Sequence, residues 1–139
     1  MPIVQYTAKL TFLSEDLSRQ WALVDARIRS MVWEVVYLAS RFGYGVFVTS
    51  LIRPDGIHST KGAADVDFVP HEEDVGVGYH AFGRMASRYV NRTYKYGTGW
   101  FGNPKPAALW HGGEDETTHA GWHLHLQAPA GRDMKLKAG

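Results

Sequence analysis

The sequence contains no cysteine among its 139 residues. This absence excludes disulfide bonds, iron–sulfur clusters and zinc sites built from thiolates. Any metal ion bound by this chain must therefore be held by imidazole and carboxylate groups. An excess of one charge sign is missing too, because the formal net charge is only +1. The sequence consequently offers no electrostatic argument for binding nucleic acid, and we expect none as a partner.

Long hydrophobic runs are missing as well. No stretch approaches the ~20 apolar residues that a transmembrane helix requires, so we expect no membrane insertion. The N-terminal residues lack a basic start followed by an apolar run, which predicts cytoplasmic synthesis without a signal peptide. An apolar content of 45% and a charged content of 21% are typical of a globular protein, and the length predicts one domain over residues 1–139.

Two stretches have the hydrophobic spacing of amphipathic helices. Apolar residues recur at intervals of three and four over about residues 15–42 and again over 78–93. Ser14, followed by two acidic residues, is a helix-start signal, and Gly43 is the expected left-handed stop of the first helix. We therefore predict two helices, the first one continuous over about seven turns.

Other stretches have the composition of strands. Apolar and β-branched runs predict strands at about 45–52 and 63–69, and an alternating run predicts another at 119–127. We expect these three strands to be adjacent and a further strand near 107–111, whereas the basic tail from 130 to 139 has little core potential. The fold class predicted is α+β, with a small, mainly antiparallel sheet backed by two helices.

Histidines are concentrated near the last predicted strand, where four of the seven lie between residues 111 and 125. Because successive side chains of a strand point to opposite faces, we expect His123 and His125 to share one face. Two imidazoles on one face, together with His58 and Asp65 upstream, suggest a metal ion. Imidazole and carboxylate suit zinc, and a catalytic zinc keeps three protein ligands and a fourth position for water.

These residues resemble the motifs of the D-alanyl-D-alanine metallopeptidase group, which has the Hedgehog/DD-peptidase zinc fold. The group includes D-Ala-D-Ala carboxypeptidases and dipeptidases, phage L-alanyl-D-glutamate endolysins and the Hedgehog signalling domain. Its hallmark is a Ser-x-His-x-x-Gly-x-Ala-x-Asp segment and a ligand histidine on the last strand. Here His58 precedes Asp65 by seven positions, with Gly62 and Ala64 between them and Gly62 one place later than usual.

The resemblance covers roughly residues 45–69 and 107–127 and implies a zinc ion (Zn2+) bound by His58, Asp65 and His125. Asp67 lies on the same predicted strand face and is an alternative ligand, or a residue that supports the ligands. The remaining histidines, His71, His80 and His111, are interpreted as ordinary surface or helix residues outside the site.

The resemblance also implies three catalytic residues. His123 is expected beside the metal, and Arg53 resembles the arginine that relatives place near the substrate, although pairing with Asp55 is an equal alternative. Many relatives carry an acidic general base shortly before the last ligand, but here His119 occupies the position six before His125. The general base is therefore His123 or His119, with the acidic stretch 114–116 as a less favoured choice.

The function implied is that of a zinc metallopeptidase that cleaves peptide bonds in bacterial peptidoglycan, in the stem peptide or the cross-link. Such an enzyme is a carboxypeptidase or an endopeptidase. The expected setting is a bacteriophage endolysin that reaches the cell wall after release, or a virion-associated module. The alternative is a catalytically inactive, zinc-stabilised binding module of the same fold. A phosphoesterase or nuclease is a distant third: His58-Ser59-Thr60 is a His-x-Thr motif, but a second copy is missing, and the near-neutral charge disfavours a nucleic-acid substrate.

Overall fold

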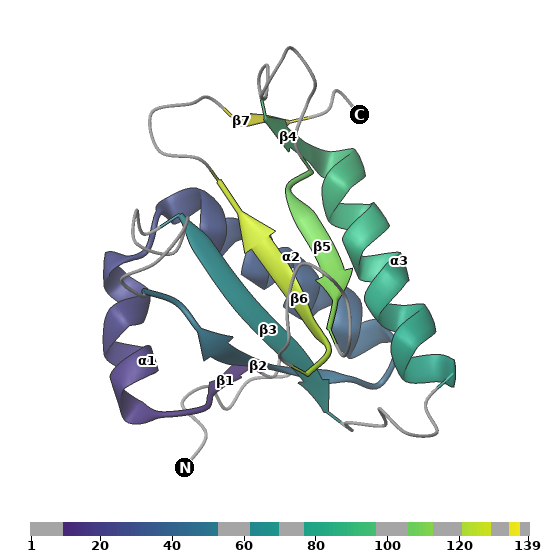
Figure 1. The fold of residues 1–139 in the computed structure, drawn as a ribbon, viewed down its shortest axis with the longest axis horizontal. Helices are drawn as coiled ribbons and strands as arrows, with labels where there is room; N and C mark the ends of the chain where they lie inside the picture. Colours follow the sequence, from purple (N-terminus) through teal and green to yellow (C-terminus); the bar gives the residue numbers. More distant parts are fainter. Residues whose placement is uncertain are drawn as a thin grey trace.

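The computed structural model describes residues 10–52, 62–69, 77–96, 106–112, 121–128 and 134–136 (Figure 1). In chain order the elements are β1 (Leu10–Phe12), α1 (Glu15–Gln20), the 3-10 helix η1 (Trp21–Leu23), α2 (Ala26–Arg41), β2 (Gly45–Ser50), β3 (Ala63–Val69), α3 (Val77–Thr93), β4 (Tyr94–Tyr96), β5 (Ala108–His111), β6 (His123–Gln127) and β7 (Met134–Leu136).

A five-stranded sheet in the order β1-β2-β3-β6-β5 forms the centre of the fold. Only β1 and β2 run parallel; the other three neighbouring pairs are antiparallel. The expected α+β class and the mainly antiparallel sheet are therefore confirmed. The predicted neighbours β2, β3 and β6 are also adjacent. A separate two-stranded sheet pairs β4 with β7, and β7 lies inside the tail from 130 to 139, for which little core potential was expected.

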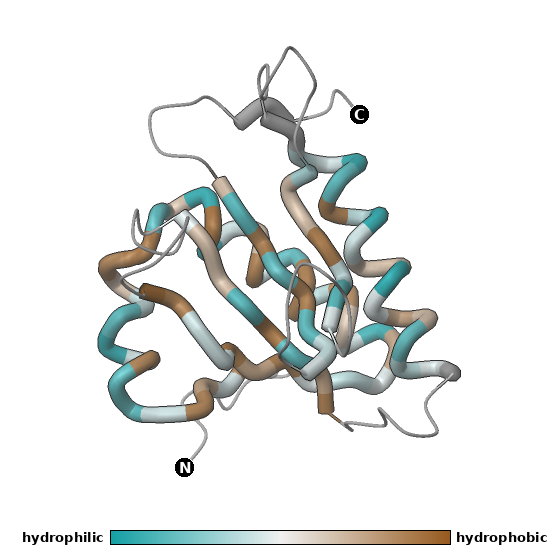
Figure 2. The backbone as a smooth tube through the Cα atoms, in the orientation of Figure 1, coloured by the Kyte–Doolittle hydropathy of each residue, from teal (hydrophilic) through white to brown (hydrophobic). Residues whose placement is uncertain are grey.

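Helices α2 and α3 cover one face of the central sheet, and the hydrophobic core lies between them and the strands (Figure 1). Along β3 and β6, hydrophobic and hydrophilic residues alternate (Figure 2). The apolar members Val66, Phe68, Leu124 and Leu126 have no exposed surface because they face the helices. Of the hydrophilic members, Asp65 and His125 are paired across the two strands and lie on the other face of the sheet.

The prediction of one continuous helix over residues 15–42 is wrong. The chain is extended at Val24, with φ −74° and ψ 150°, which separates α1 and η1 from α2. Asp25 then caps α2 by accepting a hydrogen bond from the backbone N–H of Arg27 at 2.9 Å. The described residues therefore contain three α-helices and the 3-10 helix η1 where two helices were predicted, and α1 contacts the edge strand β1 and its neighbour β2. The apolar spacing continues across the break, which is why it concealed the cap.

Two other helix predictions are confirmed. Gly43 adopts φ 84° just after α2, the left-handed conformation expected of a helix stop. Helix α3 spans Val77–Thr93, against the predicted 78–93. The Asn91 side chain of α3 accepts hydrogen bonds from the N–H groups of Ala107 and Ala108 at 2.7 and 2.9 Å, so α3 anchors the start of β5. Within the described ranges, no helix is long and apolar enough to cross a bilayer.

Candidate metal centre

The alternation predicted for the last strand is present in β6 and places its leucines and its histidines on opposite faces of the sheet. The leucines are buried against the helices. On the other face, the strand register sets Asp65 of β3 opposite His125, and His111 of β5 opposite His123. We call this surface the histidine face; it consists of Asp65, His111, His123, His125 and Gln127.

Asp65 and His125 form the closest polar pair on the histidine face. Their Oδ1 and Nδ1 atoms are 2.8 Å apart, and only 9% and 12% of the two side chains are exposed. On the neighbouring strand β2, an irregularity between Val48 and Ser50 inserts one extra residue opposite Asp65. That extra residue, Thr49, donates a hydrogen bond to the backbone carbonyl of Asp65 at 3.2 Å. The bulge therefore holds Asp65 in place at the side of β3 away from His125.

The protonation of the His125 ring follows from its neighbour Gln127. The amide nitrogen of Gln127 donates to the carbonyl of Pro106 at 2.9 Å, which turns the amide oxygen toward His125. This oxygen lies 2.9 Å from Nε2 of His125, so Nε2 carries a proton and donates it. In the neutral ring the lone pair is then on Nδ1, which faces the Asp65 carboxylate.

A carboxylate oxygen and an imidazole lone pair at this distance require a proton or a cation between them. A divalent metal ion satisfies both groups, and imidazole with carboxylate is a donor set that zinc accepts. In tetrahedral coordination with bonds of about 2.0–2.1 Å, two ligand atoms are separated by about 3.3 Å. The 2.8 Å separation of Asp65 and His125 would therefore widen by about half an ångström to receive the ion. These two donor groups are of the kinds that fit two positions around a zinc ion.

His123 lies next to this pair with its own ring orientation fixed. Its Nδ1 is 2.8 Å from the carbonyl oxygen of Gly121, so Nδ1 carries a proton, and in the neutral ring Nε2 has the lone pair. Nε2 is 3.8 Å from Oδ1 of Asp65, the oxygen that also contacts His125. His123 therefore lies beside the pair formed by Asp65 and His125, and its role as an active-site histidine stays a prediction.

His111 also belongs to this cluster, although the sequence analysis placed it outside the site. Its ring centre is 4.6 Å from that of His123 and 6.0 Å from that of His125. A close approach of two backbones brings the strands together here: a Cβ on Gly112 would lie only 2.3 Å from Cα of Trp122. The missing information was the pairing of β5 with β6, which sets His111 opposite His123 and which residue spacing does not reveal.

Asp67, the second acidic residue of β3, has a different set of partners. Its Oδ1 accepts hydrogen bonds from the Tyr79 hydroxyl at 2.5 Å and from the backbone N–H of Phe68 at 2.7 Å. Tyr79 belongs to α3 and is fully buried. Asp67 thus joins the sheet to a helix, whereas Asp65 contacts His125. This geometry favours Asp65 over Asp67 as the ligand.

The other predicted site residues, His58, His119 and Arg53, lie outside the described residues, as does the acidic stretch 114–116. Among the residues whose positions are described, no group of three or more histidine, aspartate and glutamate side chains is arranged to hold a metal ion. The described strands therefore bring together two of the three predicted ligands, Asp65 and His125, with His123 beside them. The roles of Asp65, His125 and His58 as metal ligands all stay predictions.

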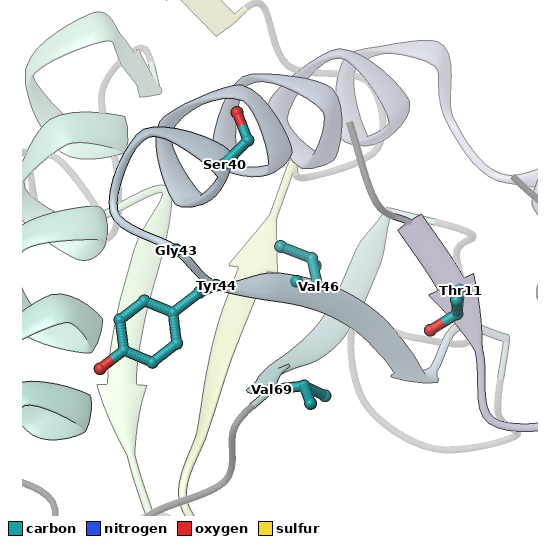
Figure 3. A pocket seen from close by; sticks show the side chains of 7 residues that line it. Thr11, Ser40, Gly43, Tyr44, Val46 and Val69 are labelled. Carbon is teal, nitrogen blue, oxygen red and sulfur yellow. The ribbon is translucent and has the colours of Figure 1, made fainter. Parts of the chain in front are cut away.

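A hollow of about 430 Å³ lies elsewhere, where the end of α2 meets β1 and β2 (Figure 3). Its lining is apolar or hydroxyl-bearing: Thr11, Ser40, Gly43, Tyr44, Gly45, Val46 and Val69. Among the described residues that line it, there is no aspartate, glutamate, histidine, lysine or arginine that would bind a charged group or catalyse a reaction. The histidine face is therefore the better candidate site, although this hollow lies elsewhere.

No protein-family model, curated protein or solved structure matches this chain. The resemblance to the D-alanyl-D-alanine metallopeptidase group therefore rests only on the motifs in this sequence, and membership of that group stays a prediction.

Proposed function

We propose that this chain is a zinc-dependent peptidase that cleaves peptide bonds in bacterial peptidoglycan, within the stem peptide or the cross-link. The observation that supports a metal is the enclosed 2.8 Å contact between the Asp65 carboxylate and Nδ1 of His125. The substrate class comes from the motif resemblance alone. The same resemblance suggests an endolysin-like role, in which the protein acts on the wall after release from the cytoplasm or from a virion.

In this proposal the residues of the histidine face bind the metal ion and accept a proton from the attacking water. Zinc, when bound, polarises a carbonyl group and lowers the pKa of a bound water to about 7. Asp65 and His125 are two of its ligands, and the third is His58. The Nε2 lone pair of His123 is positioned to accept a proton, because Nδ1 is held by the Gly121 carbonyl. His119 is the alternative base, and Arg53 is the proposed partner of a substrate carboxylate.

The metal is tested directly by elemental analysis of the purified protein. We expect about one zinc per chain, the stoichiometry of a mononuclear catalytic site. His125→Ala removes a ligand and should reduce the zinc content to near zero, while far-ultraviolet circular dichroism stays unchanged. An unchanged zinc content in this variant would exclude His125 as a ligand.

The reaction is tested by incubating the zinc-loaded protein with purified peptidoglycan and analysing the released fragments by mass spectrometry. A peptidase produces new amine termini without new reducing ends, and the fragment masses identify the bond. His125→Ala is the control and should release nothing. New reducing ends without new amines would indicate cleavage of the glycan instead and would contradict the proposal.

A zinc-stabilised binding module is the second candidate, and one observation favours it. In the strands that the structure describes, the only acids are Asp65 and Asp67, and Asp67 binds Tyr79. No additional acid therefore stands beside the imidazoles as a base in this part of the chain. Zinc-loaded protein that sediments with peptidoglycan of several wall types, yet releases no fragments, would favour the binding module.

A further inference from the structure

Gln127, which the sequence analysis did not consider, is hydrogen-bonded at both ends of its side-chain amide. The amide oxygen accepts from Nε2 of His125 at 2.9 Å, and the amide nitrogen donates to the Pro106 carbonyl at 2.9 Å. The backbone around it is held on both sides as well. The N–H of Gln127 bonds to the carbonyl of Ala107 at 2.9 Å, and the N–H of Ala128 bonds to that of Gly62 at 2.7 Å.

The partner of Gln127 is itself anchored. Pro106 precedes Ala107 and Ala108, whose N–H groups both donate to the Asn91 side chain of α3. Asn91 also donates to the Ala108 carbonyl at 2.9 Å. A chain of hydrogen bonds therefore runs from helix α3 through the start of β5 to Gln127, and from there to the ring of His125.

We propose that Gln127 is a positioning residue for the metal site: it holds the His125 ring so that Nδ1, rather than Nε2, is presented to the metal. This inference rests on the proposed zinc site. Both nitrogens of an imidazole can bind metal, and the hydrogen bond made by one decides which is left for the ion. Removing such a partner typically weakens metal binding by about 10–100-fold.

Both halves of the amide are needed for this role. The oxygen must accept from Nε2, while the NH₂ group must bond to a carbonyl that can only accept. A carboxylate at this position keeps an acceptor for Nε2, yet sets an oxygen against the Pro106 carbonyl. A methionine of similar length keeps the packing but removes both strong hydrogen bonds. The two substitutions therefore separate the contact with His125 from simple occupancy of the space.

The experiment measures zinc affinity by competition with a chromophoric chelator in wild-type protein, Gln127→Met and Gln127→Glu. We expect Gln127→Met to weaken binding by about 10–100-fold. Gln127→Glu should recover only part of that loss, because it restores the acceptor for Nε2 but not the donor to the Pro106 carbonyl. The matched control is Gln20→Met, since Gln20 also uses both amide atoms, accepting from Ile52 N–H and donating to Asp16, on helix α1. The control variant should bind zinc like the wild-type protein.

A second readout follows the ring itself. In nitrogen-15 spectra of the zinc-loaded protein, the Nε2–H of His125 should exchange slowly with water in the wild type and rapidly in Gln127→Met. Unchanged affinity and unchanged exchange in Gln127→Met would overturn the positioning role, while zinc binding itself still stands. A wild-type protein that binds no zinc would remove both this inference and the metal centre. Zinc binding without peptidoglycan cleavage would leave the role of Gln127 intact and refute only the peptidase.

Discussion

The two faces of β3 and β6 share one set of backbone hydrogen bonds but hold their side chains by different means. On the helix side, Val66 and Leu124 are fully buried in apolar surroundings, and this packing has no directional requirement. On the histidine face, Asp65 and His125 are nearly as enclosed. Their side chains are held by a specific polar contact between Oδ1 of Asp65 and Nδ1 of His125. Substituting one of two adjacent residues of a strand would therefore remove apolar packing, and substituting the other would remove a specific polar contact.

Because both faces of β3 and β6 are largely buried, burial alone does not identify the candidate metal centre. Apolar positions tolerate changes of shape better than changes of volume, and the cost of emptying them appears as lost stability. The side chains of the histidine face act through specific oxygen and nitrogen atoms. Substituting one of them should therefore reduce metal binding more than stability. The neighbouring pair Leu124 and His125 offers the sharpest comparison, since one residue step separates the two kinds of surroundings.

The largest loss of stability is expected from Leu124→Ala. Its side chain is fully buried, so truncation leaves a cavity and should lower the free energy of unfolding by about 2–5 kcal/mol. Urea unfolding of the metal-free protein measures this value. His125→Ala is the matched comparison: it should cost less stability in the metal-free protein but abolish zinc binding, which Leu124→Ala should retain. Equal losses of stability in both variants would break the contrast between the two faces.

A smaller loss is expected from Tyr79→Phe. The variant removes the hydroxyl that donates to Asp67 and leaves that enclosed carboxylate with fewer donors. Losing one partner of such a bond should lower the free energy of unfolding by about 1–3 kcal/mol. Zinc affinity should stay within the error of the wild-type value, because Asp67 is assigned to the sheet–helix junction. A tenfold loss of zinc affinity would instead connect Asp67 to the metal centre.

Hydrophobic period was a reliable guide to the faces of the strands but not to their order. The alternation of Leu124 and His125 predicts correctly which side chain meets the helices. The inclusion of His111 and Gln127 in the site depends on β5 lying beside β6 and on the Pro106 carbonyl, and these are long-range relations. No local pattern encodes them, because the residues that meet are far apart in the chain.

The second error in the predicted fold was an overlooked helix cap at Asp25. The apolar spacing that runs through residues 15–42 predicts one helix, since an extended residue at Val24 does not disturb the spacing of its neighbours. Asp25 was the available signal, because aspartate is a preferred cap and the hydrogen bond it accepts from the Arg27 N–H starts α2. The site residues His58, His119 and Arg53 lie outside the described ranges, so their placement stays a prediction.

The smallest effect on stability is expected at the N-cap of α2. There the ion pair joins Asp25 to Arg27, two residues along the chain, whereas Asp65 and His125 lie on different strands. Both Asp25 oxygens accept from the Arg27 guanidinium, at 3.0 and 2.7 Å. These hydrogen bonds lower the pKa of the Asp25 carboxyl below its usual 3.8, against a partial opposing effect of burial, and the charge of Arg29 adds to the lowering. Because the folded state favours the ionised form, the stabilisation is complete above pH 3.8 and is lost as the pH falls through the lowered value.

Asp25→Asn isolates this charge, since asparagine caps helices as well as aspartate does. About a quarter of each side chain is exposed (27% for Asp25, 30% for Arg27), so solvent screening should keep the difference in unfolding free energy below about 1 kcal/mol. Urea unfolding at a series of pH values should show the wild type more stable at neutral pH and equal to the variant in strong acid. In an Arg27→Gln background the same substitution should have a smaller, flatter effect. A wild-type advantage that grows as the pH falls would show that the pKa of Asp25 is raised in the fold, not lowered.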